Sequence, residues 1–200
     1  MKFTLKRQFL LLLICGCSFL SSQAQVKFGI KGGANFSTIS GSDASGASSL
    51  INFYGGALVR IHLVGGWGIQ PEAVYSGQGA KYSAPGYGSS TGNNAYINIP
   101  VLLTYKLPFG LSFQAGPQFG ILMSAKVKSG GVSVDEKPNY KSSDVSLAMG
   151  AAFTTPFKLG FDARYNLGLT NIENTANSGN TGQLKNGVFQ LGVFYLFGGI

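Results

Sequence analysis

The chain alternates between apolar and polar residues over blocks of about ten positions, which is typical of β-strands with two unlike faces. The longer period of an amphipathic helix is nearly absent. No stretch after Gln25 is long and apolar enough for a transmembrane helix. The alternation predicts eight strands, at Val26–Phe36, Ile51–Leu63, Trp67–Gly77, Ala95–Leu107, Leu111–Met123, Val145–Phe153, Lys158–Leu169 and Val188–Phe197.

Charged residues occur on only one face of these predicted strands. After Ala24, nine of them share the polar face, ten lie in the connections, and none lies on the apolar face. This one-sided distribution explains why only 11% of all residues are charged, against about 25% in a typical soluble domain. An uncharged face on every strand indicates surroundings without water. The nine charged residues of the polar face are Lys27, Lys31, Arg60, Glu72, Lys106, Asp144, Lys158, Asp162 and Arg164.

The connections between the predicted strands alternate in length. Three short turns, near residues 64–66, 108–110 and 154–157, alternate with long polar connections. An even number of strands with long connections at one rim is typical of bacterial outer-membrane barrels. The barrel must close, because lipid offers no partner for a backbone N–H or C=O group. The long connections are Ser37–Leu50, Gln78–Asn94, Ser124–Asp144 and Thr170–Gly187.

We therefore expect an all-β fold, an eight-stranded antiparallel up-and-down transmembrane β-barrel formed by residues 25–200, with both termini in the periplasm. Pro71, Pro100 and Pro117 fall inside predicted strands, where we expect them to mark bulges or register adjustments. The alternative is a soluble lipocalin-like ligand binder, whose apolar face would line the interior. Such a barrel would need a well-charged outer face, and nine charges over eight strands are few for that.

Residues 1–24 have the layout of a cleaved secretory signal peptide. Three basic residues in Met1–Gln8 precede the short apolar run Phe9–Ile14, and Ser22–Ala24 supplies small residues for cleavage before Gln25. A lipoprotein signal around Cys15 and Cys17 is the alternative, although Phe19 and Leu20 would be an unusual start for a lipoprotein.

Cleavage before Gln25 would remove both cysteines and three of the 15 basic residues. The remaining 12 basic and 7 acidic residues give a net charge of +5 instead of +8. This smaller charge and the export signal both argue against a nucleic-acid partner. The mature chain would also have no disulfide and no thiolate metal ligand.

Five charged residues are expected to point into the barrel. Charges in a narrow interior should pair, because an unpaired buried charge costs several kcal/mol. The favoured interpretation is a salt-bridged plug, since eight strands leave room mainly for side chains. The alternative is a proton path, a gate or a narrow porin. The five residues are Arg60, Glu72, Lys106, Asp162 and Arg164.

The C-terminal segment resembles the β-signal by which the outer-membrane assembly machinery recognises its clients. The polar residue of the pattern is Gln190, followed by Gly192 and then by the aromatic residues Tyr195 and Phe197. The chain departs from the pattern in its last three residues, 198–200, because such barrels usually end at the aromatic residue.

Four segments resemble strands of the PorT-like outer-membrane β-barrel family of Bacteroidota. The resemblance implies an integral outer-membrane barrel, although many members of that family have no known activity. The namesake of the family serves a protein-secretion system, and that role is not carried over. The four segments are Gln70–Ser76 followed by Gly79, Tyr96–Leu103, Ala115–Pro117 and Asp162–Ile172.

The functional expectation is a structural or surface-interaction protein rather than an enzyme. Its only histidine, His62, has no serine signature around it, and no P-loop, dinucleotide fingerprint, cofactor motif or metal-ligand cluster is present. The expected partners are outer-membrane lipid, lipopolysaccharide and, during insertion, the barrel-assembly machinery. The lysines of the connection Ser124–Asp144 could meet lipid phosphates or could simply be solvated. The extracellular partner is not identified.

Aromatic residues near the ends of the predicted strands would form the belts that flank the apolar band of such barrels. They are Trp67, Tyr75, Tyr105, Tyr195 and Phe197.

Overall fold

The computed structural model describes residues 25–41, 47–84, 88–174 and 184–198. The predicted signal peptide, residues 1–24, lies outside the described part. The strands are β1 (Val26–Gly41), β2 (Ala47–His62), β3 (Trp67–Ala84), β4 (Gly88–Lys106), β5 (Leu111–Ser129), β6 (Val132–Asp135), β7 (Ser143–Thr154), β8 (Leu159–Gly168) and β9 (Leu184–Leu196). One short 3-10 helix, η1 (Lys137–Asn139), follows β6.

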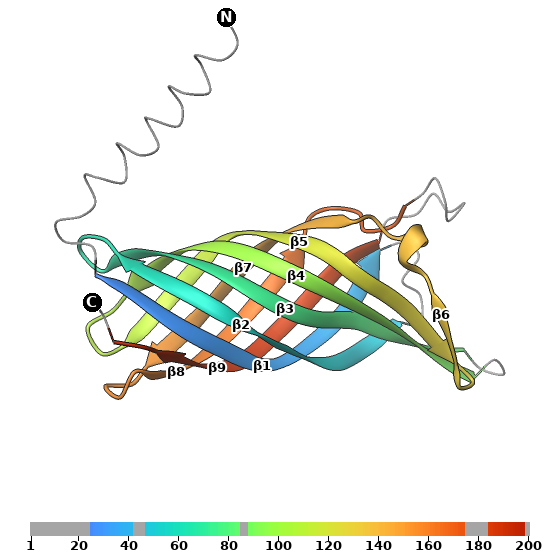
Figure 1. Cartoon of the computed structure of the whole chain (residues 1–200), viewed down its shortest axis with the longest axis horizontal. Coiled ribbons are helices and arrows are strands. Elements are labelled where there is room, and N and C mark those ends of the chain that lie inside the picture. Colours follow the sequence, from blue (N-terminus) through green and yellow to red (C-terminus); the bar gives the residue numbers. More distant parts are fainter. Residues whose placement is uncertain (1–24, 42–46, 85–87, 175–183, 199–200) are drawn as a thin grey trace, which may run out of the picture.

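Eight of these strands close into an antiparallel barrel (Figure 1). Each strand pairs with its neighbours along the chain, β1 pairs with β9, and a β4–β5 ladder completes the ring. The short β6 is an addition, because it pairs with β5 beyond the rim where β7 begins. The predicted eight-stranded up-and-down barrel is confirmed. The described chain starts and ends at the same end of the barrel, where the three tight turns also lie (Figure 1). We call this the turn end.

At the opposite end, the outer end, the strands run further than the sequence pattern predicts. β3 continues to Ala84 and β4 starts at Gly88, so most of the expected long connection Gln78–Asn94 is β-hairpin. The hydrophobic alternation stops near Gly77 because outward positions beyond it carry polar residues such as Lys81. The backbone ladder nevertheless continues, so apolar alternation marks only the apolar part of each strand.

The three prolines interrupt ladders without shifting the register. The β2–β3 ladder skips two pairs at Pro71, the β3–β4 ladder two at Pro100, and the β4–β5 ladder two at Pro117, and each resumes in the same register. The actual register shifts lie elsewhere, between Ser49 and Tyr54 and at Ala95/Tyr96. The expectation that the prolines mark bulges is therefore wrong. A proline lacks one donor, and local loss of two pairs accommodates it.

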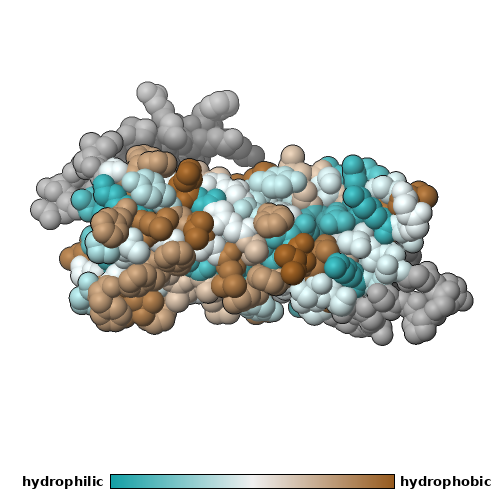
Figure 2. Space-filling view, turned by 90° about the horizontal axis from the view of Figure 1, so that it is seen from below, coloured by the Kyte–Doolittle hydropathy of each residue, from teal (hydrophilic) through white to brown (hydrophobic). Residues whose placement is uncertain are grey.

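The outer surface of the barrel is apolar over the turn-end part and polar toward the outer end (Figure 2). Trp67 and Tyr105 pack against each other at the turn end, with ring centroids 4.8 Å apart. Tyr75 points outward eight residues further along β3. With a rise of about 3.3 Å per residue and a strand tilt of about 40°, the two aromatic positions are about 20 Å apart along the barrel axis. An apolar band of this height matches the hydrocarbon layer that such barrels cross.

The interior carries the polar side chains, so the lipocalin-like alternative, with an apolar interior around a ligand, is wrong. Among the described residues, no helix is long and apolar enough to cross a membrane.

Candidate functional site in the barrel lumen

Four charged side chains from three strands meet in the middle of the lumen. Glu72 on β3 accepts two hydrogen bonds from Arg164 on β8, at 2.9 Å from Nη1 and 2.8 Å from Nη2. Lys31 on β1 lies between two carboxylates, with Nζ 3.4 Å from Glu72 and 3.3 Å from Asp162. The side chains of all four residues are no more than 2% exposed. We call these four residues the lumen network.

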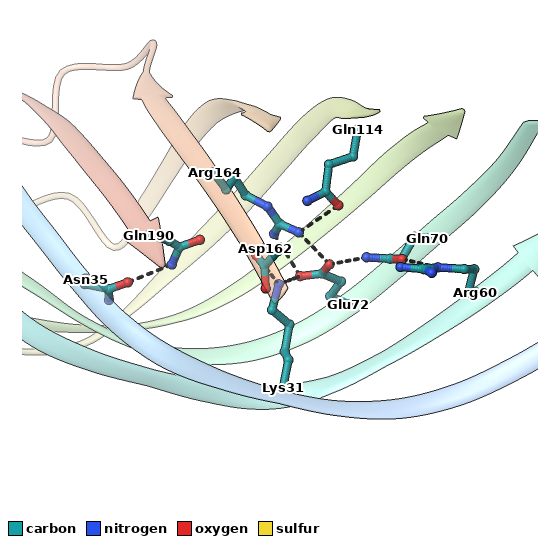
Figure 3. A network of polar contacts seen from close by, with 9 residues as sticks. All are labelled: Lys31, Asn35, Arg60, Gln70, Glu72, Gln114, Asp162, Arg164 and Gln190. Atoms are coloured by element: carbon teal, nitrogen blue, oxygen red, sulfur yellow. Dashed lines mark hydrogen bonds and ion pairs between the residues drawn. The ribbon is translucent and has the colours of Figure 1, made fainter. Parts of the chain in front are cut away.

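Two cations and two carboxylates make the lumen network electrically neutral. Removing four charges from water is costly, and the bidentate Arg164–Glu72 pair with its shared Lys31 offsets much of that cost. The Lys31 ammonium also lies 5.5 Å from the ring centre of Tyr54, which adds a cation–π contact. Because β1, β3 and β8 lie around the barrel, the network ties distant strands together across the lumen (Figure 3).

Amide side chains extend the network toward the barrel wall (Figure 3). Gln70 donates to Glu72 at 2.7 Å and accepts a 2.7 Å bond from Arg60 Nε, while Gln114 accepts a 3.2 Å bond from Arg164. A separate pair, Gln190 and Asn35, joins β9 to β1 at 2.8 Å. The gap beside the lumen network, lined by Lys31, Tyr54, Glu72 and Arg164 among others, is too small to hold a water molecule. The charged side chains therefore fill this cross-section of the lumen.

Apolar side chains close the lumen on both sides of the charged layer. On the turn-end side, Leu58, Ala152, Phe194 and Leu196 form a buried cluster. On the outer-end side there are two clusters, formed by Ile39, Ala80 and Ile172 and by Tyr96, Leu122 and Ala125.

Tyr140, from the connection after η1, packs against both outer-end clusters. Burial raises the pKa of Tyr140 to about 12, so its hydroxyl stays protonated well above neutral pH and the ring packs as a neutral group. Ile172 reaches this layer from the connection after β8 and is 1% exposed. Both residues lie beyond the barrel strands, so connections between strands contribute to closing the outer end.

The structure brings four of the five expected lumen residues together. Glu72, Asp162 and Arg164 are members of the lumen network, and Arg60 joins it through Gln70. Lys106 does not join it. It ends β4 at the rim and is exposed, because the strand reaches the turn end there. The sequence reasoning placed Lys31 on the inward face but did not include it in the cluster, although the alternation of β1 was the signal that could have found it.

The apolar interior layers were also missed. Leu58 and Phe194 occupy inward positions by the same alternation that places Arg60 and Gln190 there. The alternation along each strand could have shown that these residues point inward, but it could not have shown that they contact each other.

Gln190, Gly192 and Tyr195 of the expected β-signal lie in β9, and Phe197 directly follows the end of this strand. β9 pairs with β8 on one side and with β1 on the other. Tyr195 and Phe197 point outward and pack edge to face, with ring centroids 5.5 Å apart. A side chain at Gly192 would collide with the Tyr54 hydroxyl, so packing inside the barrel also requires glycine there.

The described residues contain no group of three or more His, Cys, Asp or Glu side chains that could hold a metal ion. The two carboxylates of the lumen network pair with Lys31 and Arg164 instead of forming an open ligand set.

A closed antiparallel barrel with an apolar exterior, an aromatic belt and a charged, packed lumen defines a membrane-spanning β-barrel protein. The family model described as outer membrane protein beta-barrel domain matches residues 21–174. The chain belongs to this family, and it is therefore a protein of the bacterial outer membrane. No curated protein matches the sequence.

Solved structures of outer-membrane barrels share the fold. Neisserial surface protein A is similar with a TM-score of 0.55 and 16% identity, over 85% of this chain and 97% of its own. Ail, the attachment invasion locus protein of Yersinia pestis, is similar with a TM-score of 0.50 and 18% identity, over 86% of this chain and 99% of its own. A second structure of Ail, in complex with the heparin analogue sucrose octasulfate, has a TM-score of 0.50 and 17% identity over the same shares. At these identities the likeness concerns the fold.

Proposed function

We propose that the protein is a non-conducting outer-membrane barrel that presents its outer end to lipopolysaccharide and to partners at the cell surface. The observation that carries the non-conducting part is the neutral lumen network, which fills the lumen between two apolar layers. A narrow porin, the alternative from the sequence, would need a continuous water-wide path. No observation on the described residues favours that path over a closed lumen, and none favours an enzymatic role.

The outer end supports the surface part of the proposal. Lys81 on β3, Thr91 on β4 and Lys128 on β5 lie side by side on one rung of the extended sheet, and Lys126 faces outward two residues from Lys128. Asp135 opposite Lys126 offsets one of these three positive charges. Ammonium groups just beyond the apolar band are well placed for the phosphate groups of lipopolysaccharide. We call Lys81, Lys126 and Lys128 the outer lysines.

The short strand β6 offers a second kind of contact at the outer end. All four residues, Val132–Asp135, are exposed, and within the described part of the chain β6 pairs only with β5. An unpaired strand edge can add a further strand from another protein.

Ail, in complex with a heparin analogue, shows that a barrel of this fold can hold a polyanion. For this chain we propose only that an external partner binds the polar outer end.

Lipopolysaccharide binding is tested by unfolding the protein in vesicles with and without lipopolysaccharide. A ligand that binds only the folded state raises the unfolding midpoint. We expect lipopolysaccharide to stabilise the wild type, and we expect the triple variant Lys81→Gln/Lys126→Gln/Lys128→Gln to lose that gain. The control Thr91→Ala, an uncharged position on the same rung between Lys81 and Lys128, should keep it. Equal gains for the wild type and the triple variant would exclude the outer lysines as the contact.

The orientation, with both termini in the periplasm, is also a proposal. It is supported by the polar, extended outer end and by the short turns near the termini, an arrangement typical of such barrels. A cysteine introduced at Val134 should react with a membrane-impermeant maleimide on intact cells, and one at Thr155 should react only after permeabilisation. The opposite pattern would reverse the orientation.

We further propose that, within the outer-membrane barrel family, the chain is a PorT-like member. The support is the set of four strand motifs in β3, β4, β5 and β8. Significant pairwise matches of these segments to PorT-like sequences, above their matches to other barrels, would test it.

A further inference from the structure

The turn end of the barrel contains a cavity that neither the plug nor the surface role uses. Its volume is about 560 Å³, and it lies between the short turns and the apolar cluster around Leu196. Five of its lining residues are basic or titratable, and the others are apolar, hydroxyl or amide residues and one glycine. The five are Lys27, Arg60, His62, Lys106 and Lys158. We call this space the turn-end cavity.

The positive charge of the turn-end cavity has no acidic counterpart. None of the described residues that line it is Asp or Glu. Lys27, Arg60, Lys106 and Lys158 therefore contribute four positive charges, and no neighbouring carboxylate lines the space with them.

The lining cations also repel one another. Lys27 and Arg60 are direct cross-strand partners on β1 and β2, a placement in which like charges are destabilising. The charges of Lys106 and Lys158 also act unfavourably on Lys27. Within the described part of the chain, the ion pairs involve Lys31 and Arg164 and none of these three lysines. An anion in the cavity would offset this repulsion.

Hydrogen bonds to neutral groups hold the Arg60 side chain in place and do not neutralise its charge. Its guanidinium donates to two neutral acceptors, Gln70 at 2.7 Å and Thr154 at 3.3 Å, and lies 5.2 Å from the ring centre of Phe194. A fixed guanidinium with three lysines in the same lining suits an anion with several oxygen atoms, because arginine supplies directed donors and lysine supplies point charge.

We propose that the turn-end cavity binds a phosphate-bearing ligand with two or more negative charges. Four cations in a lining without any carboxylate favour a multivalent anion over a single carboxylate. A volume of about 560 Å³ lies within the range of small-molecule sites, roughly 300–1,000 Å³. The phosphate can come from a lipid headgroup, since the aromatic belt of Trp67 and Tyr105 lies at this rim, or from a soluble phosphate compound. The proposal is independent of the surface function, which concerns the other end of the barrel.

Two arms of one experiment test the proposal and separate the sources. In the first, the whole protein in non-ionic detergent is titrated calorimetrically with inorganic phosphate and with glycerol 3-phosphate. In the second, its unfolding midpoint is measured in phosphatidylcholine vesicles with and without phosphatidic acid. The test variant is Lys27→Gln/Lys106→Gln/Lys158→Gln. The matched control, Lys137→Gln/Lys141→Gln/Lys185→Gln, removes the same number of charges elsewhere.

We expect binding or stabilisation for the wild type and the control, and loss of both for the test variant. A response to inorganic phosphate identifies a soluble phosphate compound, and a response to phosphatidic acid without a response to inorganic phosphate identifies a lipid headgroup. The test variant should also be more stable than the wild type in low salt without any phosphate, which shows that it folds and that repulsion was relieved. No response in either arm, or equal responses of wild type and test variant, would overturn the proposal.

Discussion

Glu72 is the residue on which the lumen network depends, because it contacts both cations. It accepts two hydrogen bonds from Arg164, lies 3.4 Å from Lys31 and accepts a further bond from Gln70. Asp162 alone would then face two buried cations. Loss of one member of a buried ion pair leaves the other charge uncompensated, which costs more than the pair contributes.

Glu72→Gln should lower the free energy of unfolding by about 3–5 kcal/mol. The measurement is urea unfolding in vesicles, followed through the fluorescence of Trp67, the single tryptophan of the chain. Asp135→Asn, at an exposed position on β6, is the control and should change the free energy by less than about 0.5 kcal/mol. Similar small changes in both variants would mean that the network does not hold the strands together.

The sequence and the structure suggest two different roles for Gly192. Its place in the expected β-signal implies recognition by the assembly machinery, whereas its position under the Tyr54 hydroxyl implies a packing constraint.

Gly192→Ala should reduce the folded fraction when the purified protein refolds into detergent micelles, where no machinery acts. Adding Tyr54→Phe removes the hydroxyl and should restore part of that loss, as seen in the folded band of an unheated gel, because the Gly32 carbonyl oxygen and the remaining ring still lie close to the added methyl group. A defect of assembly in cells that persists in the double variant would support the β-signal role. No rescue in micelles would contradict the packing explanation.

At the scale of the elements, the alternation of side chains along each strand decides which residues contact lipid. Leu191 on β9 points outward between Ala34 on β1 and Ala163 on β8, in the middle of the apolar band. Val134 on β6 is equally outward but lies in the polar extension.

Leu191→Arg should destabilise the barrel in vesicles by about 2–4 kcal/mol, because a charge near the bilayer midplane loses its water. Val134→Arg should cost about 0–1 kcal/mol, as at a position outside the hydrocarbon layer. Unfolding in urea measures both. Equal costs would mean that β9 and β6 have the same surroundings, which would contradict the placement of the membrane.

The sequence predicted most of the barrel from the phase of its strands. Outward residues such as Phe161 and inward ones such as Arg164 follow directly from alternation, which depends only on local geometry and on the absence of water outside. The outer parts of the strands could not be predicted in this way. Around Lys81 the outward face is polar, whereas the inward neighbours Ala80 and Tyr82 belong to an apolar cluster, so the alternation of the membrane-spanning part is lost although the ladder continues.

Less of the candidate site than of the fold could be predicted from the sequence. Alternation shows that Lys31 and Lys106 both point inward, but only the staggered register places Lys31 opposite Glu72 and Lys106 at the rim. Ile172 and Tyr140 reach the lumen from connections, where no periodicity exists. Register and connection geometry are long-range properties, and a local pattern does not contain them.

At the scale of the whole molecule, the barrel has three functional zones along its axis. The outer end is polar and extended, the middle is filled by the lumen network between apolar layers, and the turn end opens into a basic cavity. We propose that the filled middle separates the two ends and that ligands at one end do not pass to the other. This separation is the central claim.

Planar-bilayer conductance tests that claim most directly. Purified protein is inserted into a phosphatidylcholine bilayer in roughly 1 M potassium chloride, which screens surface charges over a few ångströms. The current trace should then show a flat baseline at low voltage. An established porin in the same bilayer serves as the positive control. A flat baseline despite confirmed insertion is the predicted result. A steady open channel with a reproducible single-channel conductance would contradict the closed lumen.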